Sequence, residues 1–400
     1  MTTFADMGVR PRTLEHLQRA SITTPLPIQT ESIPLLLQGR DAVVEAPTGS
    51  GKTHAFLIPM VERLAGHRKE GGPRGLIVAP SRELANQIGV VLRTVDPGLR
   101  VAMIYGGVGY GPQLNALRFR PDVVIGCPGR ILDLAAQGRV DFSQVEYLVL
   151  DEADEMLDQG FAPDVERIIA MTPSEGPRRR QTVLTSATMP SWVQTMVNRH
   201  LHEPARVKVV EEESRLEHAL LHVTRAGKAD TLSRLLRSNK GSALVFHRTK
   251  HGAKGLARDL NARGHRSVEL QGNLSQNARD RAVAMFRSGQ ADVLVATNVA
   301  ARGLDISAVT VVVNYELPET PQWLTHRVGR TARNGAHGRA FTFVTDEDGE
   351  KWNKLRRLGA PELPGADTEH LLSTGEIRHV AMPRLAMTSP GNGPRRRGPG

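Results

Sequence analysis

The chain has 400 residues, of which 40% are hydrophobic and 24% charged. This composition is typical of globular proteins and excludes a fibrous or wholly disordered chain, and the length suits two domains better than one. The single cysteine, Cys127, excludes an intramolecular disulfide and any multi-cysteine metal site. A formal net charge of +10 favours a polyanionic partner, although charge alone does not separate nucleic acid from an ordinary basic surface.

Short apolar runs alternate with helical segments through the first half of the chain. Most of the runs are continuous rather than alternating, which predicts parallel strands buried on both faces. Helices are expected between them, as at 82–95 and 163–171. The predicted strands are 41–45, 75–79, 101–104, 123–126, 147–150 and 182–186.

A charged stretch at 209–218, VVEEESRLEH, interrupts this pattern before it resumes. We therefore expect a first α/β domain over 1–208, a linker over 209–220 and a second α/β domain over 221–365, followed by a flexible basic tail over 366–400. Arg395–Arg397 in that tail could contact phosphates or simply be solvated. The second domain is predicted to contain strands 242–247, 267–270, 292–296, 309–314 and 339–344, with helices 250–263 and 275–288.

The segment APTGSGKT, residues 46–53, follows a predicted strand and precedes a predicted helix. This is the setting of a phosphate-binding loop, in which glycines let successive backbone N–H groups face phosphate oxygens. Lys52 would contact the β- and γ-phosphates, and the Thr53 hydroxyl would contact Mg²⁺. The expected nucleotide-binding residues of this loop are Thr48, Gly49, Ser50, Gly51, Lys52 and Thr53.

A second motif, which is acidic, follows the predicted strand 147–150. Asp151 and Glu152 begin the sequence DEAD. Asp151, with Thr53, could hold Mg²⁺, and Glu152 could orient and deprotonate an attacking water. The alternative is a solvated acidic loop, which the position directly after a buried strand disfavours.

Phosphoryl transfer also needs positive charge on the γ-phosphate. The segment HRVGRTAR, residues 326–333, lies in the second predicted domain and supplies Arg330 and Arg333 as candidate arginine fingers. If they act so, ATP is bound between the domains. A basic surface helix is the alternative for this segment taken alone.

Taken together, these motifs resemble those of the DEAD-box helicases of superfamily 2 over about residues 4–350. The resemblance implies two RecA-like domains, each a mostly parallel sheet flanked by helices, with ATP and Mg²⁺ as cofactors. It implies adenine recognition by Gln29 in TPLPIQ, packing of Ile22 on the base, and a ribose contact from Asp305 in ATNVAARGLDI. It places RNA-binding or coupling roles on Arg82 (PSREL), Gly106, Gly107, Gly129 and Arg130 (PGR), Ser186 and Thr188 (SAT), Arg279, Thr297 and Arg302.

Several positions depart from the family pattern. Ser21 and Ala332 stand where glycine is usual, Cys127 replaces a threonine, and Asn298 replaces a common aspartate. None of these changes removes an expected catalytic group, so ATP hydrolysis is expected to be intact. The changes bear instead on RNA grip and on coupling.

The resemblance implies an ATP-dependent RNA helicase that unwinds short duplexes or remodels RNA–protein complexes, holding RNA through its backbone without sequence preference. Two alternatives stay open: a DNA helicase, and an ATP-gated RNA clamp or assembly scaffold with little unwinding. Ribosomal or RNA-decay proteins are conceivable partners. No apolar stretch reaches the roughly 18 residues that cross a bilayer, so we expect a cytoplasmic monomer with no membrane partner.

Overall fold

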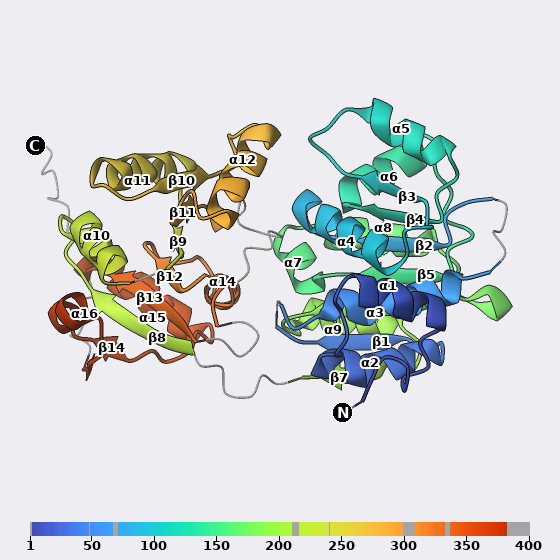
Figure 1. Ribbon diagram of the computed structural model, residues 1–400, viewed down its shortest axis with the longest axis horizontal. Coiled ribbons are helices and arrows are strands. Elements are labelled where there is room, and N and C mark those ends of the chain that lie inside the picture. Colours follow the sequence, from blue (N-terminus) through green and yellow to red (C-terminus); the bar gives the residue numbers. More distant parts are fainter. Residues whose placement is uncertain are drawn as a thin grey trace, which may run out of the picture. The chain divides into compact units, whose positions relative to one another are not determined.

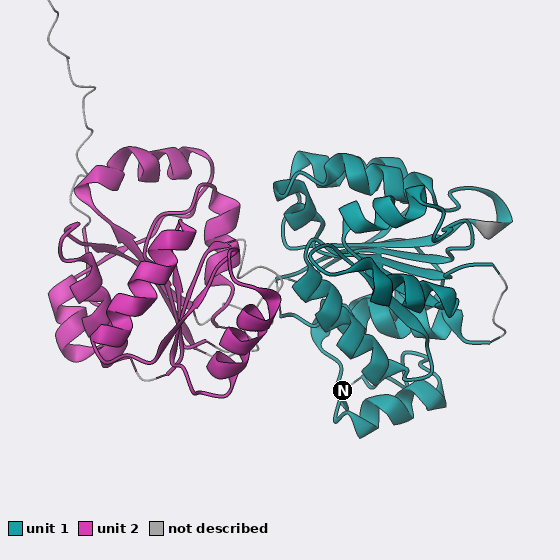
Figure 2. Cartoon of the chain, turned by 90° about the horizontal axis from the view of Figure 1, so that it is seen from above, with its two compact units in different colours: residues 1–212, 302–305 teal, residues 213–301, 306–400 magenta. Residues whose placement is uncertain are grey.

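The computed structural model of the protein describes residues 2–47, 49–66, 71–209, 216–239, 241–298, 309–332 and 337–381. The described residues divide into two compact units, the first up to residue 209 and the second from residue 216 onward (Figure 2). No helix within these ranges is long and apolar enough to cross a bilayer.

The first unit contains a seven-stranded sheet in the order β3-β4-β2-β5-β6-β1-β7, in which every pair of neighbouring strands is parallel (Figure 1). Its strands are β1 (Ala42–Glu45), β2 (Gly75–Val78), β3 (Val101–Ile104), β4 (Val123–Gly126), β5 (Tyr147–Leu150), β6 (Gln181–Ser186) and β7 (Ala205–Lys208). Its helices are α1 (Pro11–Arg19), α2 (Pro27–Leu37), α3 (Lys52–Leu64), α4 (Arg82–Val95), α5 (Tyr110–Arg118), α6 (Pro128–Ala136), α7 (Ala153–Asp158), α8 (Ala162–Ala170) and α9 (Ser191–His200).

Both faces of this sheet are buried beneath helices, as the continuous apolar runs predict. Successive strand residues alternate between two core layers, because side chains in a strand point to opposite faces. Val44 and Ile77 lie in one layer, whereas Val43 and Leu76 lie in the other. Figure 2 shows the strands of this unit with helices on both sides. The expectation of parallel strands with two covered faces is confirmed.

The second unit contains an eight-stranded sheet in the order β10-β11-β9-β12-β13-β8-β14-β15, and only the short β14–β15 pair is antiparallel among its described strands. The strands are β8 (Leu216–His222), β9 (Ala243–Phe246), β10 (Ser267–Leu270), β11 (Val293–Ala296), β12 (Val311–Asn314), β13 (Gly338–Val344), β14 (Gly365–Ala366) and β15 (His379–Val380). The helices are α10 (Lys228–Ser238), α11 (Lys250–Ala262), α12 (Gln276–Arg287), α14 (Pro321–Val328), α15 (Gly349–Arg357) and α16 (Thr368–Thr374).

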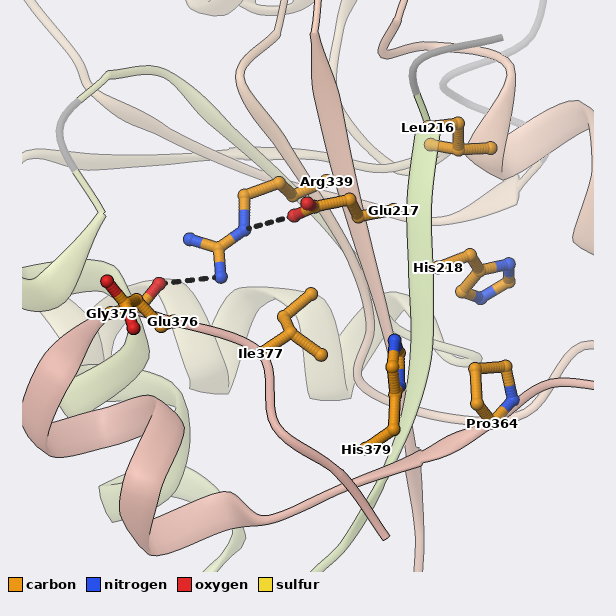
Figure 3. A pocket seen from close by; sticks show the side chains of 9 residues that line it. All are labelled: Leu216, Glu217, His218, Arg339, Pro364, Gly375, Glu376, Ile377 and His379. Atoms are coloured by element: carbon orange, nitrogen blue, oxygen red, sulfur yellow. Dashed lines mark hydrogen bonds and ion pairs between the residues drawn. The ribbon is translucent and has the colours of Figure 1, made fainter. Parts of the chain in front are cut away.

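Two boundaries differ from those expected. The strand β8 begins at Leu216, inside the predicted linker, because its central residues enter the core of the second unit. Order also continues past residue 366 to at least 381. There Leu371 of α16 is fully buried, and the Arg339 guanidinium donates to the Gly375 carbonyl at 2.8 Å (Figure 3). Arg395–Arg397 lie outside the described residues.

Candidate nucleotide and nucleic-acid site

Three neighbouring strands of the first unit end at three of the predicted motifs, two assigned to ATP chemistry and one to coupling. In the sheet β5, β6 and β1 are adjacent and parallel, so their carboxyl ends share one edge. The glycine-rich loop follows β1, the DEAD residues follow β5, and the SAT residues lie at the end of β6. In parallel α/β sheets this edge is where ligands bind.

The glycine-rich loop depends on its glycines. Gly49 and Gly51 have φ values of 92° and 94°, in the left-handed region that other residues rarely adopt. A Cβ on Gly51 would also lie 2.6 Å from the Leu26 side chain and 2.7 Å from the Gln29 amide nitrogen. The N-cap residue of α3, Gly51, has no side chain to cap the first turn, which leaves the backbone N–H groups there for an anion. Thr48 lies outside the described residues.

Lys52 and Asp151 are buried at this edge, with 7% and 3% of their surface exposed. The Lys52 ammonium donates to the Ala46 carbonyl and, at 2.9 Å, to the Pro47 carbonyl. Asp151 accepts a hydrogen bond from the Thr185 hydroxyl. Burial raises the pKa of the Asp151 carboxyl, opposed by that hydrogen bond and by the charge of Lys52.

These groups fit a divalent cation. Burial disfavours the ionised form of a carboxyl group, and an adjacent cation stabilises that form. Mg²⁺ prefers oxygen ligands and phosphates. Asp151 supplies such an oxygen, and the half-buried Thr53 follows Lys52 in the first turn of α3. The residues expected to hold Mg²⁺ are therefore of the right chemistry.

Glu152 lies in a strained backbone conformation, with φ 52° and ψ 58°. Such strain persists where surrounding contacts fix it, and it concentrates at functional sites. Here the Glu152 N–H donates to the Thr185 hydroxyl at 3.2 Å. Thr185 therefore contacts both acids, a role that the sequence reading missed. The available signal was a buried hydroxyl near the end of a strand that leads into a predicted motif.

The SAT residues are tied to the last aspartate of the DEAD motif. The Thr188 N–H and hydroxyl both donate to the Asp154 carboxylate at 2.8 Å. The Asp154 N–H in turn donates to the Ser186 hydroxyl at 3.3 Å. Asp154 was not among the predicted site residues, although its place in the motif could have suggested it. These bonds link α7, which follows β5, to the end of β6 and the residues just after it.

Gln29 joins the glycine-rich loop to α2. Its amide oxygen accepts from the Leu26 N–H at 3.0 Å, and its amide nitrogen donates to the Gly51 carbonyl at 3.1 Å. The side chain is 2% exposed, so it supports the loop directly. Ile22 is partly buried and packs against the core of the unit.

The residues expected to contact RNA in the first unit lie where β2, β3 and β4 end. These strands are adjacent in the sheet, and α4, α5 and α6 begin just beyond them. The N-cap residues of α5 and α6, Gly109 and Cys127, make no side-chain cap bond, so the free N–H groups of these first turns can receive phosphates. The predicted residues in this region are Arg82, Gly106, Gly107, Gly129 and Arg130.

Two arginines are held in place at this edge. A Cβ on Gly107 would lie 3.1 Å from the Arg82 guanidinium, so glycine leaves room for that group. The Arg130 guanidinium lies over the Tyr110 ring, 4.1 Å from its centroid, and 3.5 Å from the Asp133 carboxylate. Burial raises the pKa of the nearby Cys127 thiol to about 12, which keeps it protonated near neutral pH.

The second unit carries the remaining predicted residues that the structure describes. Thr297 directly follows β11, Arg279 lies in the first turn of α12, and Arg330 lies just after α14 and is 8% exposed. Arg302, Asp305 and Arg333 lie outside the described residues. Arg327, three residues before Arg330, is 2% exposed and was not predicted.

Comparison with known families accounts for both units. The DEAD/DEAH box helicase model matches residues 26–196, and the helicase conserved C-terminal domain model matches residues 227–335. The DEAD-box ATP-dependent RNA helicase CshA of Geobacillus kaustophilus is 42% identical over 354 residues, covering 87% of this chain and 74% of the relative. The Bacillus subtilis protein of the same description is 40% identical over 352 residues, covering 86% and 70%.

Solved structures give the same result for the fold. Saccharomyces cerevisiae Dbp5 bound to RNA and ADP BeF3 is similar with a TM-score of 0.80 and 29% identity, covering 93% of this chain and 98% of that one. A DEAD box protein from Methanococcus jannaschii gives a TM-score of 0.56 and 32% identity, covering 91% and 98%.

Proposed function

Since this chain belongs to the DEAD-box family of ATP-dependent RNA helicases, we propose that ATP is hydrolysed by the residues at the ends of β1, β5 and β6, with arginines from the second unit. The activity of the family is ATP-driven remodelling of RNA. The observation that carries the assignment of residues is the shared edge, where Lys52, Asp151 and Glu152 follow neighbouring strands.

In the proposed mechanism, the N–H groups at the start of α3 and the Lys52 ammonium bind the phosphates. Lys52 leaves the carbonyls of Ala46 and Pro47 to do so. Asp151 and Thr53 would hold Mg²⁺, which when bound neutralises phosphate charge. Glu152 orients a water for attack on the γ-phosphate and takes its proton.

Arg330 and Arg333 are the proposed arginine fingers. Their role would be to stabilise negative charge on the phosphoryl group during transfer. They belong to the second unit, so hydrolysis would depend on both units acting on one ATP. Asp305 remains the predicted ribose contact.

RNA is proposed to bind through its backbone. In the first unit the uncapped starts of α5 and α6, together with Arg82 and Arg130, are suited to phosphates. Arg279, Thr297 and Arg302 are the predicted contacts from the second unit. The hydrogen bonds of Ser186 and Thr188 with Asp154 would couple ATP hydrolysis to RNA binding. The proposal includes local duplex separation in a cytoplasmic monomer.

The test is the steady-state ATPase rate without nucleic acid, with single-stranded RNA and with the matching DNA, each at stated salt because phosphate contacts are salt-dependent. Stimulation by RNA and not by DNA is expected. Equal stimulation by DNA would replace the proposal with a DNA helicase. RNA-stimulated hydrolysis without strand separation would favour an RNA clamp.

Glu152→Gln tests the general base. This change keeps the size of the side chain and removes its basicity, so ATP binding should persist while turnover falls by about 10² or more. The exposed Glu31→Gln in α2 is the matched control and should hydrolyse ATP normally. Normal turnover by Glu152→Gln would contradict the assignment.

A further inference from the structure

Two fully buried polar side chains face each other in the sheet of the second unit. Asn314 ends β12 and Thr342 lies in β13, where the parallel register places them opposite one another, and both are 0% exposed. A buried polar group is costly unless it is hydrogen-bonded, and an apolar residue would pack there without that cost. Their contacts therefore indicate what they do.

These side chains form part of a hydrogen-bonded chain across three strands. The Asn314 amide nitrogen donates to the Thr342 hydroxyl at 2.9 Å. That hydroxyl lies 2.9 Å from the Nε2 atom of His218 in β8. Burial lowers the pKa of His218 to about 4, so its ring is neutral near pH 7. Because the hydroxyl already accepts from Asn314, its own hydrogen is free to be donated to Nε2.

At His218 this series of hydrogen bonds reaches a pocket of about 740 Å³, which lies beside β8 and the segment after α16. Figure 3 shows His218 and Glu217, successive residues of β8, on opposite sides of the strand. Arg339 bridges Glu217 and the Gly375 carbonyl there, at 3.5 Å and 2.8 Å. These contacts hold β8, and with it His218, against the segment that follows α16.

At the end opposite His218, the series of hydrogen bonds reaches Arg327 of α14. The Arg327 guanidinium donates to the Asn314 side-chain oxygen at 3.1 Å and to the Glu316 carbonyl at 2.8 Å. It also donates to the Asn298 side-chain oxygen at 2.5 Å. The Arg330 N–H then donates to the Arg327 carbonyl at 3.2 Å. The backbone that carries Arg330 is thus bonded to the residue that the buried chain holds.

We infer that Thr342 and Asn314 are positioning residues for ATP hydrolysis, which fix Arg327 and through it the turn that carries Arg330. The inference rests on the proposed role of Arg330 as an arginine finger. Both side chains are fully buried, so neither is placed to contact ATP. Each acts by limiting where the guanidinium of Arg327, and therefore the end of α14, can lie.

Thr342→Val is the direct test, because it keeps the shape of the side chain and removes the hydroxyl. In the full-length protein with saturating RNA, kcat is expected to fall about ten-fold while KM for ATP changes less than two-fold, since the fingers act in the transition state. Thr342→Ser keeps the hydroxyl and should restore kcat.

The control for a merely structural role is Ser233→Ala. Ser233 of α10 is also buried and its hydroxyl lies 2.8 Å from Nε2 of His265, away from α14. This variant loses an equivalent bond and should lower the unfolding midpoint without lowering kcat. An equal loss of kcat in Ser233→Ala and Thr342→Val would overturn the inference.

Arg330→Ala separates failure of this inference from failure of the proposed function. If Arg330→Ala retains full kcat, the finger assignment fails. If Arg330→Ala loses kcat and Thr342→Val does not, only the positioning role fails. If both lose kcat, adding Thr342→Val to Arg330→Ala should lower kcat no further, and an additional ten-fold loss would overturn the inference.

A second variant covers the case in which Thr342→Val does not fold. His218→Leu removes the other partner of the Thr342 hydroxyl at the edge of the pocket. It should lower kcat by about three-fold, with KM for ATP unchanged. An unchanged kcat would overturn the inference.

Discussion

Two residues that depart from the family pattern have the same unusual backbone conformation. Ser21 and Ala332, which stand where glycine is usual, have φ values of 61° and 55°. A residue with a Cβ is disfavoured there by about 1–2 kcal/mol. The departures are therefore tolerated at a cost in stability, and they remove no functional group.

Ser21→Gly and Ala332→Gly should each raise the free energy of unfolding by about 0.5–1 kcal/mol. The relief of left-handed strain exceeds the entropy that glycine adds to the unfolded chain, about 0.5–1 kcal/mol. Urea denaturation measures both changes. Ala20→Gly is the control, because Ala20 has φ −87° and should lose stability. A loss in Ser21→Gly would refute the strain argument.

With asparagine at position 298, the buried Arg327 guanidinium has no negatively charged acceptor among the residues described. The three oxygens that accept from Arg327 are uncharged, and its Nη2 atom has no hydrogen-bond partner among the residues described. Burial accordingly lowers the pKa of Arg327 to about 9. An aspartate at 298 would supply a negative charge and a second oxygen.

Asn298→Asp should therefore raise the free energy of unfolding by about 1–2 kcal/mol, because hydrogen bonds to a charged partner are stronger. The reference variant is Asn298→Ala, which removes the bond to Arg327 and should be less stable than the natural chain. Denaturation of the three proteins at pH 7.5 measures the order. If Asn298→Asp ranked below the natural chain, the charge argument would fail.

At the scale of elements, the sequence predicted the strands that carry continuous apolar runs. The strands β1 to β6 and β9 to β13 lie within about two residues of their expected positions, because burial on both faces requires such runs. The strands β7, β8, β14 and β15 were missed. The strand β8 begins inside the charged stretch that predicted a linker. Residues of β7 alternate between buried and exposed, and β14 and β15 have only two residues each, too few for a periodic signal.

The part of the candidate site that lies in recognisable sequence motifs was predictable from the sequence. Lys52, Asp151 and Glu152 were identified because their chemistry and their place after apolar runs are visible in the sequence. The contacts of Thr185 with the two acids, and the hydrogen-bonded series from His218 to Arg327, depend on which strands lie side by side. No local pattern specifies that His218 of β8 will meet Thr342 of β13, 124 residues later.

The packing of β8 against β13 also makes stability depend on pH. Because burial lowers the pKa of His218 to about 4, from 6.5, the unfolded chain binds a proton between these values that the folded chain does not. This contribution is fully present above pH 6.5 and is lost as pH falls toward 4.

We therefore expect the folded state to lose about 1 kcal/mol between pH 7.5 and 5.5 through this residue. His218→Gln cannot take up the proton and should show a shallower decline over the same range. Urea midpoints across the range measure it, and exposed His251→Gln should decline like the natural chain. Parallel curves for His218→Gln and the natural chain would exclude the contribution.

At the scale of the whole molecule, each unit has its own hydrophobic core. The described core residues of the first unit all lie between Phe4 and Val207, and those of the second lie between Ala219 and Leu371. Binding of the phosphates is proposed for the first unit alone, whereas the fingers belong to the second. Folding and nucleotide binding should therefore separate from hydrolysis when the chain is divided.

A fragment of residues 1–209 should unfold cooperatively and bind a fluorescent ATP analogue, because it contains both core layers and the glycine-rich loop. Its RNA-stimulated hydrolysis should fall by about 10³-fold or more relative to the full chain, the typical contribution of an arginine finger. Full-length Arg330→Ala provides the comparison, since it removes one finger from an otherwise complete protein. Hydrolysis by the fragment at the full-length rate would show that the second unit supplies no catalytic charge. Binding lost with folding intact would instead place essential nucleotide contacts beyond residue 209.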